Sequence, residues 1–375
     1  MTSKRGFAME EKRHVLPVRK DGEYCYSIVL EKNFDMLARE VKSLGNAERK
    51  ICIVTDSQVG PLYAEEVCRE LSRVCKAVTV YTIEAGEANK TLDTVKGLYE
   101  HLILEHFDRK DLLAALGGGV VGDLTGFTAA TYLRGIDFIQ IPTTLLAQVD
   151  SSIGGKTGVD FDSYKNMVGA FHMPRLVYMN LSVLKTLTDR QFACGMAEIL
   201  KHGLIKNGEY FDWLLEKKEA IQRREYEALL PMIEESCKIK RAVVEQDPTE
   251  QGERALLNFG HTIGHAVEKL KNFQMMHGEC VALGSVAAAY LSCRRGLLSE
   301  ADVEKIRQGF AAFSLPLQTE GMDTEAVIRT TKSDKKMEAG SIKFILLRQI
   351  GDAVIDRSVT EEELRTAIRK ISEGR

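Results

Sequence analysis

The feature that most constrains the fold is an alternation of short apolar runs with amphipathic helical patterns in the first half of the chain. Apolar runs at 50–56, 77–83 and 136–142 predict buried strands, and 61–74 and 91–107 carry apolar residues at helical spacing. Strands that alternate with helices favour a mainly parallel sheet that helices cover. We therefore predict an α/β fold for this half.

After about residue 187 the pattern changes to long helices. The helical patterns span 224–247, 261–270 and 280–298, and 341–347 is the only convincing late strand. We expect an α/β domain over residues 1–187 and a mostly helical domain over 188–375, packed closely around a cleft. We assign no role to the first twenty residues.

Composition excludes several classes of protein. A net charge of −3 and a pI near 6.3 give no reason to expect a nucleic-acid or membrane partner. We find no secretory signal and no stretch long enough to span a bilayer. The eight cysteines lack CxxC spacing, which favours reduced core thiols in the cytoplasm and argues against cysteine as a metal ligand.

Three adjacent glycines follow a predicted strand in DLLAALGGGVVGD, residues 111–123. Such glycines let backbone N–H groups approach an anion at the start of the next helix. The spacing is not GxGxxG, and a tight turn without a ligand is the alternative. A dinucleotide or phosphate ligand is the better prediction.

A second glycine-rich stretch, DSSIGGKTGVDFDSYKN at 150–166, contains Asp150, Lys156, Lys165 and Asn166. We interpret it as a loop, because it is too polar and glycine-rich for a core element. Its spaced lysines suit a phosphorylated substrate. A solvated surface loop is an equal alternative.

The helical pattern GMAEILKHGLI places Glu198, Lys201 and His202 on one face. Its polar trio is either an exposed stripe or an inward-facing site.

His261 and His265 are spaced i,i+4 on another helical pattern, and His277 follows across a short polar loop. The general-base Glu of HExxH is missing. Catalytic zinc commonly takes three ligands from His and carboxylate, so Glu198 is the natural carboxylate, but spacing does not choose among the histidines.

Together these blocks resemble the 3-dehydroquinate synthases of the sugar-phosphate cyclase group. The resemblance runs from about Ile51 to Ile350 through GGGVVGD, IPTTLLAQVDSSIGGKTGVD, KNMVGAF, GMAEILKHG, LNFGHTIGHAVE and HGECVALG. It implies an N-terminal NAD-binding domain, and a mostly helical C-terminal domain that binds a divalent metal, usually Zn²⁺, with Co²⁺ possible. The implied metal ligands are Glu198, His261 and His277, and His265 is left to bind substrate and help move protons.

The resemblance also implies the other site residues. The implied NAD contacts are Asp56, Glu87, Lys90, Gly118, Gly119, Val120, Asp123, Thr143, Thr144, Lys165 and Thr186. The implied substrate contacts are Asp150, Lys156, Asn166, Lys201, Lys240, Arg254, Asn258, His265 and either Lys335 or Lys336. Arg134 is expected to reach the substrate phosphate of a neighbouring subunit in a homodimer.

The implied activity is a step of the shikimate pathway of aromatic amino-acid biosynthesis. The substrate would be the keto-acid phosphate 3-deoxy-D-arabino-heptulosonate 7-phosphate (DAHP), converted to 3-dehydroquinate and phosphate with transient use of NAD. The alternatives are a sibling cyclase of other sugar phosphates, an NAD- and metal-dependent polyol or alcohol dehydrogenase, and a non-catalytic NAD- or zinc-binding protein.

Overall fold

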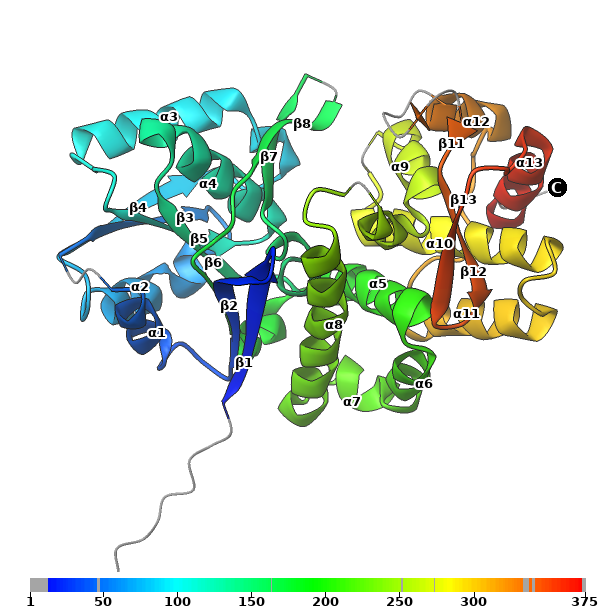
Figure 1. The fold of residues 1–375 in the computed structure, drawn as a ribbon, viewed down its shortest axis with the longest axis horizontal. Coiled ribbons are helices and arrows are strands. Elements are labelled where there is room, and N and C mark those ends of the chain that lie inside the picture. The colour runs from blue at the N-terminus through cyan, green and yellow to red at the C-terminus, as the bar shows by residue number, and fades with distance from the viewer. Residues whose placement is uncertain are drawn as a thin grey trace, which may run out of the picture.

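The computed structural model has an α/β half and a helical half that lie next to one another (Figure 1). It describes residues 13–45, 48–162, 164–250, 252–272, 274–332, 337–338 and 341–372. Lys335 and Lys336 lie outside these ranges, so their predicted role stays untested.

The α/β half is built on a seven-stranded sheet of order β1-β2-β9-β6-β5-β3-β4. Its strands are β1 (His14–Lys20), β2 (Glu23–Glu31), β3 (Lys50–Asp56), β4 (Ala77–Ile83), β5 (Leu112–Gly117), β6 (Asp137–Pro142) and β9 (Leu176–Asn180). Every neighbouring pair is parallel except β1 with β2. The predicted parallel sheet is confirmed.

Helices cover both faces of this sheet (Figure 1). The helices α1 (Leu37–Ser43) and α2 (Gly60–Leu71) bury apolar side chains on one face, and α3 (Leu92–Leu104) and α4 (Gly119–Thr131) do so on the other. Because both faces are covered, the central strands carry almost continuous apolar runs. Ile51 to Val54 of β3, for example, are fully buried.

Two predictions about strands were wrong. The stretch 150–166 is not a simple loop, because β7 (Lys156–Phe161) and β8 (Tyr164–Phe171) form an antiparallel hairpin within and beyond it. These strands pair only with each other and stay partly exposed, so their sequence lacks the apolar run of a core strand. Late in the chain, β12 (Phe344–Gln349) pairs with a missed strand, β13 (Asp352–Asp356). Short strands β10 (Met337–Glu338) and β11 (Ser341–Ile342) form a further pair.

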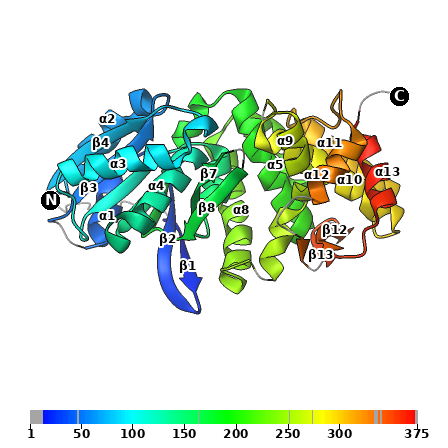
Figure 2. The same ribbon diagram turned by 90° about the horizontal axis from the view of Figure 1, so that it is seen from above.

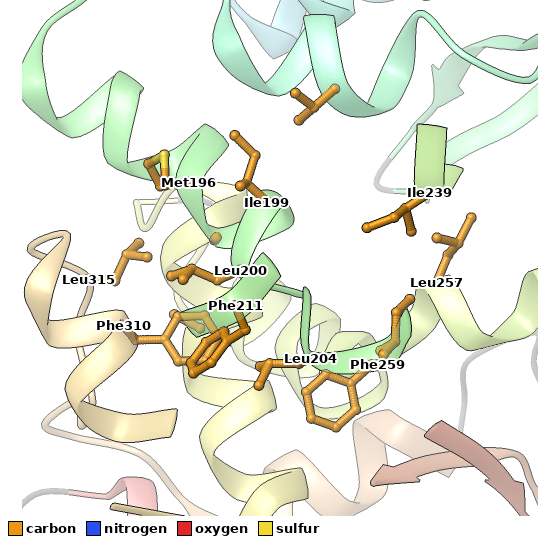
Figure 3. Packing of buried hydrophobic residues seen from close by; sticks show 14 of the residues in the cluster. Met196, Ile199, Leu200, Leu204, Phe211, Ile239, Leu257, Phe259, Phe310 and Leu315 are labelled. Atoms are coloured by element: carbon orange, nitrogen blue, oxygen red, sulfur yellow. The ribbon is translucent and has the colours of Figure 1, made fainter. Parts of the chain in front are cut away.

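The second half is mainly helical, as predicted. Its helices are α5 (Asp189–Lys206), α6 (Gly208–Glu216), α7 (Lys218–Gln222), α8 (Tyr226–Gln246), α9 (His261–Leu270), α10 (His277–Arg294), α11 (Glu300–Ala312), α12 (Thr324–Lys332) and α13 (Glu361–Ile371), with the 3-10 turn η5 (Glu253–Asn258) before α9. Figure 3 shows Met196, Ile199 and Leu200 of α5 among the buried side chains of this half. None of the described helices is long and apolar enough to cross a membrane.

The chain passes between the halves through the 3-10 turn η4 (Leu181–Thr186), which follows β9 and precedes α5. The two halves lie end to end along the molecule (Figure 2). One hydrophobic cluster runs across the junction, since Tyr26 and Ile28 of β2 belong to the same cluster as the buried side chains of α5 and α8. The boundary at residue 187 stays a prediction.

Candidate active site

A cleft of about 1340 Å³ is lined by side chains from both halves of the chain. Its wall includes the sequence-predicted residues Asp56, Glu87, Lys90, Gly118, Gly119, Val120, Asp123, Thr143, Thr144, Asp150, Lys156, Lys165, Asn166, Thr186, Lys201, Lys240, Arg254, Asn258, His261, His265 and His277. Glu198 is fully buried behind this wall. The fold therefore brings together residues that are up to about two hundred positions apart in the sequence.

The start of α4 lies at the cleft wall. Gly118 precedes α4 in an extended conformation, and no side chain caps the helix. A Cβ atom added at Gly119 would lie 3.2 Å from the Oγ of Ser151, so a larger residue there would crowd the wall. Free N–H groups at a helix start suit a pyrophosphate. This end of the cleft fits the predicted dinucleotide.

Asp56 ends β3, as expected of an acidic group that contacts a ribose. Its Oδ1 accepts hydrogen bonds from the N–H groups of Gln58 (2.9 Å) and Val59 (2.8 Å). These bonds hold the carboxylate at the cleft wall. Nearby, Thr186 is 2.6 Å from the hydroxyl of Tyr63, a cleft residue that the sequence analysis missed and for which we see no sequence signal.

Lys90 is a buried cation of the cleft wall, next to α4. Its Nζ donates to Asp123 Oδ2 (2.6 Å) and to Asn166 Oδ1 (2.5 Å). Burial lowers the pKa of Lys90, but Asp123 and Glu87 outweigh that effect and the pKa is raised overall. Lys90 thereby joins the start of α3, α4 and β8 at one point.

Two further cations of the cleft wall, Lys240 and Arg254, are buried. The buried Lys240 donates to Asp150 Oδ1 at 2.5 Å, and burial, which alone would raise the pKa of Asp150, is outweighed by Lys240, so this pKa is lowered. Arg254 is 2% exposed and donates to the carbonyl oxygen of Pro248 at 2.7 Å. Buried cations that line a cleft suit an anionic ligand.

Glu250 is a second cleft residue that the sequence analysis missed. Its carboxylate forms an ion pair with Lys156 and accepts a hydrogen bond from Asn258 Nδ2 at 2.7 Å. It therefore links two predicted substrate contacts. It stands in a polar run, DPTEQGE, which has no pattern that could have singled it out.

Glycines bring the three ligand-bearing helices together. A side chain at Gly278 of α10 would overlap the backbone of Cys194 in α5, and one at Gly284 would overlap Gly260 before α9. The close approach of α10 to both neighbours places His277 beside Glu198 and His261. His277 is the first residue of α10, so this helix begins before the predicted helical pattern at 280.

The geometry around Glu198 favours a metal ion. His261 Nε2 and His277 Nε2 both lie 3.6 Å from Glu198 Oε1. Lys201 forms an ion pair with Oε2, whereas among the described residues no hydrogen bond satisfies Oε1 of this buried carboxylate. The Nδ1–H of His261 donates to the Phe259 carbonyl at 3.1 Å, which leaves Nε2 as the ligand atom. Two imidazoles and a carboxylate are a donor set that suits Zn²⁺ or Co²⁺.

Neighbouring charges shift the pKa values of Glu198 and His277. Burial alone would raise the pKa of Glu198, but Lys201 and His277 lower it below its usual range. Burial alone would lower the pKa of His277, but Glu198 and Glu268 raise it to about 9. A metal ion that binds His277 would compete with protonation of its imidazole.

The described residues offer two further groups of potential ligand atoms, namely His265 with Glu268 and His277, and Asp150 with Glu198 and His202. No group contains both His261 and His265, which disfavours the i,i+4 pair, and none contains a cysteine. His202 is buried and its Nδ1 lies 2.7 Å from the hydroxyl of Ser236. Burial and Lys201 lower the pKa of His202 to about 3, so it is a neutral core histidine.

Arg134 lies apart from the other predicted residues. Its side chain is exposed and does not line the described cleft of its own chain. Leu133 and Arg134 both have left-handed backbone angles, with φ of 50° and 69°, which turn the chain sharply after α4. Its predicted role in a neighbouring subunit stays a prediction.

Solved structures support the fold. The 2-epi-5-epi-valiolone synthase of Streptomyces hygroscopicus subsp. jinggangensis, solved with NAD⁺ and Zn²⁺ bound, is 28% identical, with a TM-score of 0.85 over 95% of this chain and 99% of that one. A 2-deoxy-scyllo-inosose synthase solved with carbaglucose-6-phosphate, NAD⁺ and Co²⁺ is 25% identical, with a TM-score of 0.84 over 96% and 99% of the two chains. A glycerol dehydrogenase of Schizosaccharomyces pombe, at 14% identity and a TM-score of 0.65 over 92% of this chain and 88% of that one, shares the fold alone.

Other relatives share a higher sequence identity with this chain. The 3-dehydroquinate synthase of Ruminiclostridium cellulolyticum is 41% identical over 94% of this chain and 97% of its own. That of Desulforamulus reducens is 44% identical over 91% and 94%. Family models described as 3-dehydroquinate synthase N-terminal and C-terminal match residues 80–194 and 195–337. The chain belongs to the 3-dehydroquinate synthase family.

Proposed function

We propose that this chain is a 3-dehydroquinate synthase, a carbon–oxygen lyase that converts DAHP into 3-dehydroquinate and inorganic phosphate. The observation that carries the proposal is the convergence of Glu198, His261 and His277 at the end of a cleft that also holds a glycine cradle and buried cations. Relatives of that name at 41% and 44% identity support it. We propose NAD as the cofactor and Zn²⁺, with Co²⁺ as a substitute, as the metal.

When bound, NAD supplies a reversible hydride acceptor and the metal supplies Lewis-acid polarisation of hydroxyl and carbonyl oxygens. The start of α4 and Asp56 orient the cofactor. Lys156, Arg254 and Asn258 bind the carboxylate end of the substrate. His265, which lies beside His261 with ring centroids 5.2 Å apart, holds or moves a proton near the reacting carbons. After phosphate has left, the ring closes by an intramolecular aldol step while the cleft residues hold the chain folded.

The phosphate end completes the proposal. Lys201 and Lys240 are buried cations on the cleft wall, and Arg134 is an exposed cation outside it. We propose that Arg134 reaches the substrate phosphate of the second subunit in a homodimer. The eight free cysteines support a reducing compartment, and we propose the cytoplasm.

The test is an incubation of the purified protein with DAHP, NAD and Zn²⁺, in which phosphate release and the absorbance of NADH are followed together. Phosphate release without lasting NADH, abolished by a chelator, is expected. Lasting NADH with a simple polyol and no phosphate from DAHP would overturn the proposal in favour of a dehydrogenase. Release from sedoheptulose 7-phosphate or glucose 6-phosphate alone would identify a sibling cyclase.

A further inference from the structure

The imidazole of His277 lies between two buried carboxylates. Its Nε2 is 3.6 Å from Glu198 Oε1, and its Nδ1 is 3.5 Å from Glu268 Oε2. Glu268 stands at the end of α9 and is 4% exposed. A ring that offers one nitrogen to a metal commonly presents its other N–H to a carboxylate, which fixes the tautomer and the ring orientation. Glu268 occupies that second position.

The other oxygen of Glu268 contacts the opposite half of the molecule. Lys165 Nζ lies 2.8 Å from Glu268 Oε1 and 3.8 Å from Glu87 Oε1. Lys165 belongs to β8, and Glu87 belongs to the short turn η1 (Glu87–Asn89), so both come from the α/β half. The neighbouring Lys269 lies 5.5 Å from the ring centroid of Tyr164, which also belongs to β8. Two adjacent residues of α9 thus contact β8.

Glu268 also fits a different role, since its carboxylate, His265 and His277 form one of the potential ligand groups. The contacts argue against that role in two ways. A lysine pairs with one oxygen of each carboxylate, Lys165 with Glu268 Oε1 and Lys201 with Glu198 Oε2, but Glu198 Oε1 has no hydrogen-bond partner within the described ranges and lies 3.6 Å from Nε2 of both His261 and His277. His261, moreover, presents Nε2 toward Glu198 with its Nδ1 occupied by a carbonyl group. A metal at Glu198 leaves the Nδ1 of His277 to Glu268.

We propose that Glu268 is a positioning residue for the metal ligand His277, and that Lys165 holds Glu268 in place from β8. The strength of metal binding in the helical half then depends on a contact with the α/β half. This proposal rests on the metal site proposed above. Glu268 and Lys165 act on that site without being metal ligands themselves.

The experiment measures metal affinity without any substrate. Metal-free protein is titrated with Zn²⁺ against a competing chelator, and with Co²⁺ while its visible absorption is recorded. The variants are Glu268→Gln, Lys165→Met, their double variant and Glu198→Gln. Glu363→Gln is the matched control, because Glu363 pairs with Arg295 just after the other end of α10. Glutamine preserves the shape of each glutamate, and thermal unfolding checks that every variant is folded.

We expect Glu268→Gln to weaken Zn²⁺ binding by about 10- to 100-fold, the range typical of residues that orient a metal ligand. The Co²⁺ absorption should keep the band pattern of the wild type, because the ligand set is unchanged. Lys165→Met should weaken binding less, and the double variant should bind as Glu268→Gln does, since Lys165 acts through Glu268. Glu363→Gln should bind as the wild type does.

Three outcomes would overturn the proposal. Unchanged Zn²⁺ affinity in Glu268→Gln would exclude a positioning role. A loss as large as that of Glu198→Gln, with an altered Co²⁺ spectrum, would make Glu268 a ligand. Additive effects of Glu268→Gln and Lys165→Met would separate the two residues. A wild-type protein that binds no Zn²⁺ would instead refute the proposed metal site, so the two failures are distinguishable.

Discussion

The two ends of helix α10 carry similar charged groups in opposite states. At its start, His277 lies between Glu198 and Glu268, and Oε1 of Glu198 has no hydrogen-bond partner within the described part of the chain. Just after its end, Arg295 donates to both oxygens of Glu363 at 2.8 Å and to Asp356 Oδ2 at 2.7 Å. The carboxylate at the start of α10 can still accept a ligand, whereas the charged groups after its end already pair with one another.

The difference teaches which charged cluster serves function and which serves stability. Buried polar groups that lack partners cost stability and persist where a ligand completes them. In a bidentate arginine–carboxylate pair with a further acceptor, the charged groups satisfy one another's hydrogen bonds and need no ligand. We therefore expect changes at the start of α10 to alter metal binding, and changes at its end to alter only the free energy of unfolding.

The largest effect is expected from Glu198→Gln at the start of the helix. Loss of a ligand charge should weaken Zn²⁺ binding and lower turnover of DAHP by more than about 100-fold, beyond the range for residues that only orient ligands. Chelator competition and phosphate release measure the two quantities. The same substitution at the other end, Glu363→Gln, is the control and should change neither. Zn²⁺ binding that survives Glu198→Gln would contradict the contrast.

A smaller effect is expected from Asp150→Asn, which removes the counter-charge of the buried Lys240. An unpaired buried cation is costly, but the partial access of Asp150 to the cleft reduces the cost, so we expect a loss of about 2 kcal/mol in the free energy of unfolding. Urea denaturation without metal measures it. Because both residues also line the cleft, turnover should fall too. A variant as stable as the wild type would show that Lys240 does not depend on Asp150.

Arg295→Met should cost about 1 to 2 kcal/mol of stability, because it removes charge-assisted bonds that remain partly open to solvent. Urea denaturation should show the loss, while Zn²⁺ affinity and phosphate release stay at wild-type values. A fall in Zn²⁺ affinity would mean that the two ends of α10 are coupled, and would remove the contrast between them.

The smallest effect concerns pH. Hydrogen bonds from Arg295 come first among the causes that lower the pKa of Glu363 to about 2, from an ordinary value of 4.5. Because the folded pKa is depressed, the stabilisation by Glu363 is complete above pH 4.5 and is lost as pH falls toward 2. The difference in unfolding free energy between wild type and Glu363→Gln should shrink over this window. A difference that is independent of pH would contradict it.

Much of the fold was predictable because it depends on local patterns. The predicted strands 50–56 and 77–83 coincide with β3 and β4. The buried central strand β3 leaves a continuous apolar run, and the edge strand β4 is rich in β-branched residues although most of it is partly exposed. The β7–β8 hairpin and β13 were missed for the converse reason. They are partly exposed and pair with a single neighbour, so their sequences carry no such run.

The candidate site was predictable as a set of residue types, and less so as an arrangement. His261, His265 and Glu268 are spaced i, i+4 and i+7 on α9, so helical spacing could have drawn attention to Glu268. Nothing in the polar run around Glu250 could have done the same. Which histidines lie near Glu198 depended on how α5, α9 and α10 pack.

By itself, then, the sequence determined the parallel sheet, the change to helices, the glycine turn before α4 and the residue types available to a metal. Apolar periodicity and glycine placement are local properties that can be recognised in the sequence alone. Only the tertiary structure decided that His261 and His277 lie near Glu198, that Glu268 and Lys165 join the two halves, and that Arg134 stands apart from its own cleft. The positions of His261 and His277 beside Glu198 depend on the close approach of helices at Gly278 and Gly284, which no spacing along one helix encodes.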